Sequence, residues 1–176
     1  MKNYLIFLFS AIVLSITSCT NTEEIEFVTH HDVTLNVNTS EMYEQWEFGR
    51  SPYEKFLGDN RNYSIGVTSL VYNKEHKLIR SQKNYIKTFT SLTQKFDNLP
   101  DGEYTVVTFE TIVNDENNYE SEIWSLENVS SLDSLMVTYP EYWVIYWYNS
   151  FGVTYTTINV GKNTYYEAIP EPVGCM

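Results

Sequence analysis

A turn followed by a long strand, between Phe96 and Val113, constrains the fold of this chain more than any other stretch of its sequence. Pro100 presets φ at one turn position, and Gly102 can adopt a backbone conformation that a Cβ would forbid. From Tyr104 onward most residues are Val, Thr, Phe or Ile, which favour a pleated, half-buried backbone. At the start of this stretch, the side chains on both faces of the predicted strand are largely apolar. We therefore predict that a strand ending at Phe96 turns into a central strand that is covered on both sides.

The rest of the chain alternates strand patterns with turn signals. The other predicted strands are 31–39, 63–72, 77–81, 85–96, 137–149, 153–160 and 165–169, with long loops at 40–62 and 114–122. The residues 128–135 predict one or two helical turns, and Asn149 to Gly152 predicts the turn of a hairpin between 137–149 and 153–160. Pro170 and Pro172 are expected to end the last strand, because proline donates no ladder hydrogen bond. These patterns predict an all-β chain, folded as an antiparallel β-sandwich of about seven or eight strands.

The N-terminus reads as a targeting segment. Lys2 precedes an apolar run, Tyr4 to Ile16, that is short for a membrane-spanning helix. The run ends in Ile16-Thr17-Ser18-Cys19, which resembles the lipobox of bacterial lipoproteins. That resemblance implies cleavage before Cys19 and acylation of its thiol, and two or three acyl chains hold a protein on a membrane durably. An ordinary secretory signal with an incidental cysteine is the alternative.

The resemblance also divides the chain. It implies a signal peptide over residues 1–18, and the composition and strand patterns predict an acidic tether over 19–30, a single sandwich domain over 31–170 and a tail over 171–176. Glu23 and Glu24 resemble the surface-export signal of Bacteroidota lipoproteins, so we expect a lipid-anchored protein of the bacterial outer membrane that faces the cell exterior. Cys175 lies in the predicted tail, and we assign it no role.

A second resemblance is carried by the central turn and strand. The pattern Phe96-x-x-Leu99-Pro100-x-Gly102-x-Tyr104-x-Val106 is similar to that of prealbumin-like (transthyretin-like) sandwiches, and the fimbrillin and fimbrial-anchor lipoproteins of Bacteroidota share it. The resemblance implies a prealbumin-like or Ig-like sandwich and fimbrial subunits as partners. Known fimbrial anchors are generally longer and have a second sandwich, which leaves the assembly role open.

Composition argues against several other functions. With 11 basic and 23 acidic side chains, the formal net charge is −12, which disfavours nucleic acid as a partner. The sequence has no Gly-rich phosphate loop and no Gly-x-Ser-x-Gly motif, so we expect neither a nucleotide nor an enzyme. His30, His31 and Asp32 are neighbours on a predicted strand and would point to opposite faces. The acidic residues 115–122 lack EF-hand spacing. We therefore expect no metal and no cofactor.

One aromatic strand is the feature most like a binding site. In residues 142–148, period two places Trp143, Ile145 and Trp147 on one face. The opposite face carries Tyr142, Tyr146 and Tyr148, and Tyr155 on the next strand extends that row. Tyrosines in a flat row could stack on sugars or become buried under a partner subunit. The alternative is a core strand whose second face is covered by residues 40–62.

Three classes of function remain open at this point. The leading hypothesis is a non-enzymatic outer-membrane lipoprotein, anchored through Cys19, that acts in adhesion or as a fimbria-related anchor or accessory subunit. The second is a glycan-binding surface module that uses the tyrosine face. The third is an exported hydrolase or inhibitor whose site carries no recognisable motif.

Overall fold

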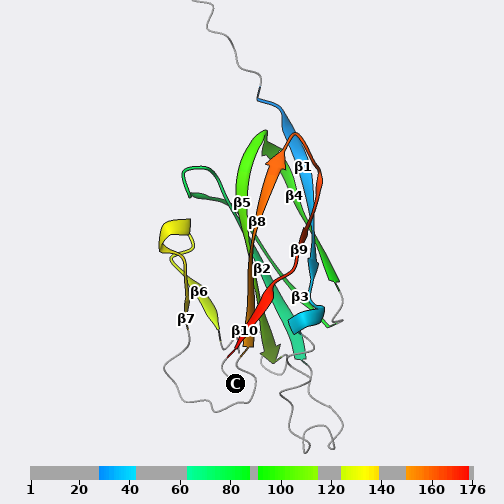
Figure 1. The fold of residues 1–176 in the computed structure, drawn as a ribbon, viewed down its shortest axis with the longest axis vertical. Helices are drawn as coiled ribbons and strands as arrows, with labels where there is room; N and C mark the ends of the chain where they lie inside the picture. The colour runs from blue at the N-terminus through cyan, green and yellow to red at the C-terminus, as the bar shows by residue number, and fades with distance from the viewer. Residues whose placement is uncertain (1–27, 43–62, 88–90, 115–123, 139–149, 175–176) are drawn as a thin grey trace, which may run out of the picture.

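The computed structural model describes residues 28–42, 63–87, 91–114, 124–138 and 150–174. Nearly all of them lie in strands, which confirms the predicted all-β class (Figure 1). The elements are β1 (His30–Asn38), β2 (Tyr63–Tyr72), β3 (Leu78–Ile86), β4 (Ser91–Pro100), β5 (Gly102–Asn114), β6 (Ser125–Glu127), the 3₁₀ helix η2 (Leu132–Ser134), β7 (Met136–Thr138), β8 (Ser150–Val160), β9 (Tyr165–Ala168) and β10 (Glu171–Gly174). Residues 40–42 are helical.

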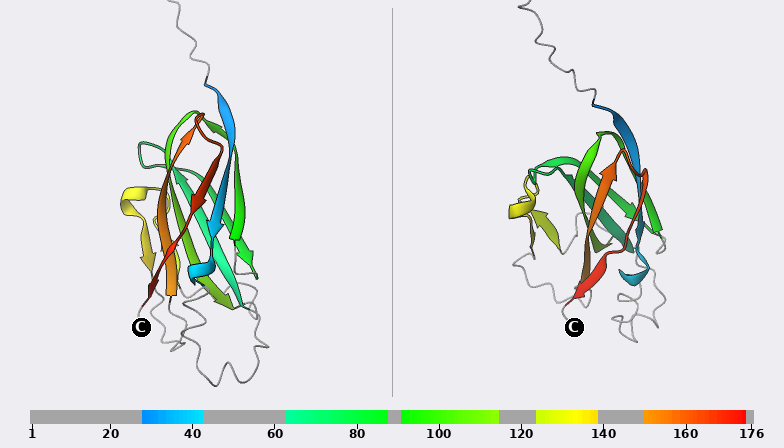
Figure 2. Two further views of the ribbon diagram at one scale, coloured as in Figure 1. Left: turned by 45° about the vertical axis from the view of Figure 1, so that its right-hand side comes forward. Right: turned by 45° about the horizontal axis from the view of Figure 1, so that its top comes forward.

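Two sheets face each other and form the sandwich (Figures 1 and 2). The smaller sheet has the order β4-β1-β9, and the larger has the order β10-β8-β5-β2-β3. Strand neighbours are antiparallel except for β1 and β9, which run parallel. The prediction of a central strand after Tyr104 is confirmed, because β5 occupies the middle of the larger sheet and is buried on both faces.

The main core lies between the two sheets and is built by alternation. On β1 the side chains of Val33, Leu35 and Val37 are buried, as their spacing predicts. On β5, Tyr104 and Val106 point into the same core. The cluster is completed by Met42, Ile65, Val67, Val71, Phe96, Leu99, Ile158, Val160 and Ala168. Each such aliphatic side chain contributes about 1.5–3 kcal/mol on burial, so this layer is the main source of stability.

The turn between β4 and β5 differs from the prediction in one respect. Strand β4 does not end at Phe96 but continues to Pro100, through a shift of register opposite His31 and Val33. At this bulge Asn98 has a positive φ of 57°, and its N–H donates to Asp32 Oδ1 at 2.9 Å. Asparagine tolerates the left-handed region better than most residues, which permits the extra length. The Tyr104 hydroxyl then donates to the carbonyl of Pro100 at 2.8 Å and ties the turn to β5.

Three other boundaries also need correction. Tyr85 and Ile86, predicted in the fourth strand, belong to β3. Residues 150–152, predicted as a hairpin turn, are the start of β8, which pairs with β5 and β10. Of the predicted strand 137–149, residues 137 and 138 belong to the short β7, and 139–149 lie outside the described residues.

The C-terminal prolines do not end the sheet. After β9 the chain passes Pro170 and enters β10, so part of the predicted tail 171–176 is a strand of the other sheet. Pro172 is tolerated because β10 lies at the edge, where a missing N–H costs no central ladder bond.

The signal segment, Cys19 and Cys175 lie outside the described residues. In the part of the chain that is described, no helix has the length and apolarity needed to cross a membrane.

Candidate functional site: a pocket on the outer face of the larger sheet

The larger sheet has a second apolar cluster on the face that points away from the main core. Because side chains alternate along β5, Val107 and Phe109 point outward where Tyr104 and Val106 point inward. The outward cluster consists of buried Leu70, Tyr72 and Val107 together with partly buried Leu78, Leu126, Val129, Leu132, Leu135 and Val153. An apolar sheet face of this size requires a cover, and the chain supplies one.

The cover is formed by residues 124–138, which contain β6, η2 and β7 and which we call the cover segment (Figure 1). It is fixed to the end of the β2–β3 hairpin by main-chain hydrogen bonds, from Leu78 N to Ser130 O at 3.1 Å and from Leu132 N to His76 O at 2.9 Å. The Tyr72 hydroxyl adds a bond to Val129 O at 2.9 Å. His76 Nδ1 lies 2.5 Å from Asp133 Oδ1. The cover segment is therefore held mainly at its η2 end.

A pocket of about 340 Å³ lies between the cover segment and strands β2, β3 and β5. We call it the outer-face pocket. Its lining mixes apolar and polar side chains, namely Thr68, Leu70, Leu78, Ser81, Gln82, Lys83, Phe109, Ser125, Leu126 and Val129. Pockets of this size and mixed character are the usual sites for small ligands, with a few polar groups fixing the orientation.

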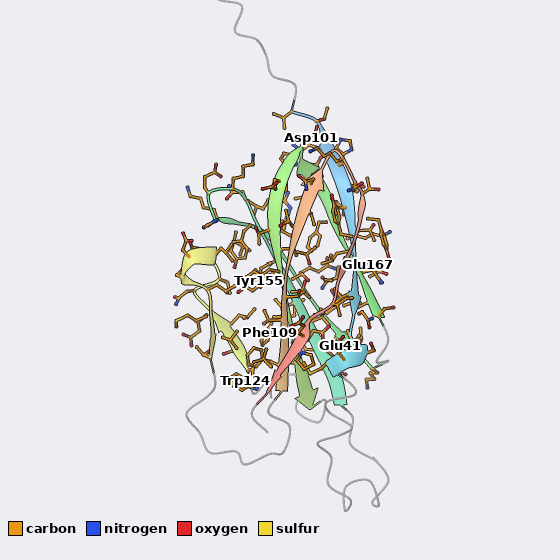
Figure 3. All side chains as sticks on the ribbon, viewed as in Figure 1. Glu41, Asp101, Phe109, Trp124, Tyr155 and Glu167 are labelled. Atoms are coloured by element: carbon orange, nitrogen blue, oxygen red, sulfur yellow. The ribbon has the colours of Figure 1, made fainter. Side chains whose placement is uncertain are left out.

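Aromatic rings border this pocket at its β6 end. The ring centroids of Phe109 and Phe151 are 5.7 Å apart, and those of Trp124 and Phe151 are 4.7 Å apart. Tyr155 lies on the same face of the sheet, opposite Val107, and 64% of its surface is exposed (Figure 3). The pKa of the neighbouring Tyr72 is raised, first by burial and second by Tyr155. The outer face thus has a buried aromatic group beside an exposed one.

The predicted site residues have different outcomes. Tyr155 is exposed on the outer face, where a ligand could reach it. Tyr142, Tyr146 and Tyr148 lie outside the described residues, so the predicted tyrosine row stays a prediction, and so does acylation of Cys19. Sequence reasoning missed the polar residues Thr68 and Ser81, because they come together with the cover segment only in three dimensions. The one available signal was β5, whose two apolar faces indicated that each face is covered.

The titratable groups outside the pocket have separate roles. His30 and His31 turn to different partners, since His30 Nδ1 lies 3.1 Å from Val28 O and His31 Nε2 lies 3.1 Å from Asp101 Oδ1. Within the described ranges, no three His, Cys, Asp or Glu side chains are grouped so that they could hold a metal ion.

Glu110 is the most perturbed acid of the described chain. It points from β5 into the sandwich core, is 0% exposed, and neither carboxyl oxygen has a hydrogen-bond partner. Its Oε2 lies 3.5 Å from the position that a Cβ on Gly152 would take. Burial, together with the charge of Glu41, raises the pKa of Glu110 to about 8. The side chain is therefore mostly neutral at pH 7.

Comparisons with known proteins give structural likeness only. No protein-family model matches the chain, and no curated protein matches its sequence. The chain is similar to the solved structure of a candidate polysaccharide-binding protein of Bacteroides thetaiotaomicron, at 13% identity and a TM-score of 0.47, over 81% of this chain and 47% of that one. It is also similar to a fimbrial assembly protein of Parabacteroides distasonis, at 11% identity and a TM-score of 0.36, over 83% of this chain and 53% of that one. The chain spans about half the length of each structure. At these identities and scores the likenesses support no statement about function.

Proposed function

We propose that this chain is a non-enzymatic, lipid-anchored surface domain that acts in adhesion by binding a saccharide unit in the outer-face pocket. The observation that supports it is the lining of that pocket. Thr68, Ser81 and Ser125 supply hydroxyl groups beside the apolar surface of Leu78 and Leu126. A sugar ring presents the complementary chemistry, because its hydroxyls form hydrogen bonds while its C–H face packs on apolar and aromatic side chains.

The same lining supports a binding role rather than catalysis. Its described residues include serines and a lysine, but no carboxylate, imidazole or thiol. A serine nucleophile requires an adjacent base, and hydrolysis of a glycosidic bond usually requires a pair of carboxyl groups. Glu110, the acid with a raised pKa, lies on the opposite face of β5, away from the pocket.

Anchoring rests on the residues 16–19 and is proposed on the sequence alone. Changing Cys19 to Ala should remove the acylated thiol and release the protein from the membrane fraction. The measurement is fractionation of the producing bacterium, followed by mass spectrometry of the mature N-terminus. Retention of the variant in the membrane fraction would contradict lipidation, whatever the protein binds.

The binding proposal is tested with a glycan array on residues 20–176, followed by titration of the best ligand. Changing Thr68 to Val removes one hydroxyl partner, and changing Ser81 to Phe fills part of the pocket. One hydrogen bond contributes about 0.5–1.5 kcal/mol, so Thr68→Val should weaken binding roughly two- to tenfold, and Ser81→Phe should weaken it further. The exposed Lys95 on β4 supplies the control Lys95→Ala. Absence of any glycan ligand, or equal affinity for all four proteins, would refute the proposal.

A fimbria-related anchor or accessory role is a second proposal, supported by the motif from Phe96 to Val106. In the structure this motif forms the β4–β5 hairpin and delivers the central strand of the larger sheet. Co-purification of fimbrial subunits with the native protein would support this role, and their absence under mild detergent extraction would remove it.

A further inference from the structure

A second pocket, of about 330 Å³, lies at the end of the sandwich where residues 28–30 enter β1. We call it the end pocket. It lies between the start of β1, the β2–β3 hairpin and the β4–β5 turn, on the face of the larger sheet that carries the main core, because the core residues Leu99 and Tyr104 line it. Its lining includes His30, Asn73, Arg80, Asn98, Leu99 and Tyr104. None of these residues lines the outer-face pocket, so the two pockets can be tested separately.

The end pocket contains a cation that the described chain leaves without an acidic partner. Arg80 Nη1 donates to the carbonyl of Ile79 at 2.9 Å, and among the described residues no carboxylate lies within ion-pair distance of its guanidinium. This is notable in a chain with 23 acidic and 11 basic side chains. A guanidinium has five N–H donors in a planar fork, so most of them remain available to a ligand.

The other polar groups of the end pocket are mainly donors as well. Asn73 Oδ1 accepts a hydrogen bond from Lys77 N at 2.9 Å, which leaves the amide NH₂ of Asn73 to donate. His30 Nδ1 donates to the carbonyl of Val28, so the Nε2 of the neutral ring is an acceptor, which can take a hydrogen bond from a ligand hydroxyl. Asn98 contributes a third polar side chain from the positive-φ position at the bulge. A surplus of donors around one guanidinium suits an oxygen-rich anion.

The nearby carboxylates are already occupied by other donors. Asp101 Oδ1 lies 3.1 Å from His31 Nε2, and Asp101 Oδ2 accepts a hydrogen bond from Thr29. Asp32 Oδ1 accepts the N–H of Asn98 at 2.9 Å. The positive field of Arg80 reaches the pocket wall, because it lowers the pKa of Tyr104 against the larger upward effects of burial and Asp101.

From these contacts we propose that the end pocket binds a carboxylate-bearing sugar unit, a hexuronic acid residue. The Arg80 fork would hold the carboxylate, and the amides of Asn73 and Asn98 would bind ring hydroxyls. The partly exposed side chains of Pro100 and Ile79 provide an apolar floor for the C–H face of the ring. This site does not depend on what occupies the outer-face pocket.

The test is calorimetric titration of the full mature chain with sodium glucuronate, sodium acetate and glucose. A charged bidentate pair contributes about 1.5–3 kcal/mol, so Arg80→Gln should weaken glucuronate binding roughly ten- to a hundredfold. Glucose and acetate should each bind at least about tenfold more weakly than glucuronate. The control Lys95→Gln removes the same charge from an exposed position on β4 and should leave the affinity within about twofold.

Several results would overturn the assignment. Equal losses in Arg80→Gln and Lys95→Gln would show only a long-range effect of charge. Equal affinity for glucose would remove the role of the carboxylate, and equal affinity for acetate would remove the sugar. No heat of binding up to about 10 mM glucuronate would remove the site altogether. Because Arg80 is exposed, the variant should keep the wild-type melting temperature, and one-dimensional NMR checks its fold.

Discussion

The neutral Glu110 makes the stability of this domain depend on pH in a direction opposite to that of most carboxylates. Its pKa is about 8 in the folded chain, against 4.5 for the free side chain. Between these two values the folded state keeps a proton that the unfolded state has lost. The stabilisation contributed by Glu110 therefore falls as the pH rises from 4.5 to 8, and this contribution is constant below and above that range.

The size of the effect follows from the shift. Each pKa unit corresponds to about 1.4 kcal/mol, so the full shift corresponds to about 5 kcal/mol. Between pH 5.5 and pH 7.5 the free energy of unfolding should fall by roughly 2.7 kcal/mol because of Glu110 alone. Domains of this size unfold at about 5–15 kcal/mol, so the loss is a large part of the total.

The perturbation that isolates this term is Glu110→Gln, which keeps the shape of the side chain and removes its titration. Urea unfolding of both proteins at pH 5.5, 6.5 and 7.5 gives the difference in free energy, and contributions from other groups cancel. The wild-type protein should lose about 1.4 kcal/mol per pH unit relative to the variant. Glu103→Gln, at an exposed position of the same strand, is the matched control. Parallel curves for wild type and Glu110→Gln would refute the reasoning, because Glu110 would then be hydrated or paired when folded.

Three further substitutions test other contacts by urea unfolding. Tyr72→Phe removes the bond to Val129 O and should cost about 1 kcal/mol; no cost would mean that this bond does not hold the cover segment. Gly152→Ala would place a Cβ 3.1 Å from both Met42 Cε and Pro170 Cβ and should destabilise by about 1–3 kcal/mol, whereas a gain in stability would show that Pro170 can move away. Tyr155→Ala, at an exposed position, should change the free energy of unfolding by less than about 0.5 kcal/mol; a larger loss would show that Tyr155 is covered.

The parts of the fold that could be predicted are those whose information is local. Val33, Leu35 and Val37 show their buried face by spacing alone, and the two apolar faces of β5 indicate a central position. The β2–β3 hairpin could be predicted because two strand patterns flank one turn. Strand β3 extends beyond the predicted end at residue 81, because its second half is polar and gave no strand pattern.

The rest depends on contacts that no local pattern encodes. Strands β6 and β7 have three residues each, too few for alternation to show. Strand β10 contains a proline, and only its edge position makes that acceptable. Both pockets join residues from several strands, so Ser81 and Arg80 carry no signal of their own in the sequence. Glu110 reads as an ordinary polar residue of β5, and Gly152 opposite it gave no hint of a buried acid.

The parallel pairing of β1 with β9 sets an order of events for folding. Thr34 pairs with Tyr165, so this contact closes a loop of about 130 residues, and long loops are closed late and slowly. The following strand then completes the opposite edge, beside β8. A nascent chain that lacks residues 165–174 would expose β1 on one side and leave β8 as a bare edge, open to pairing with other chains. The two sheets can therefore be completed only after residues 165–174 have been made and can dock on β1 and β8.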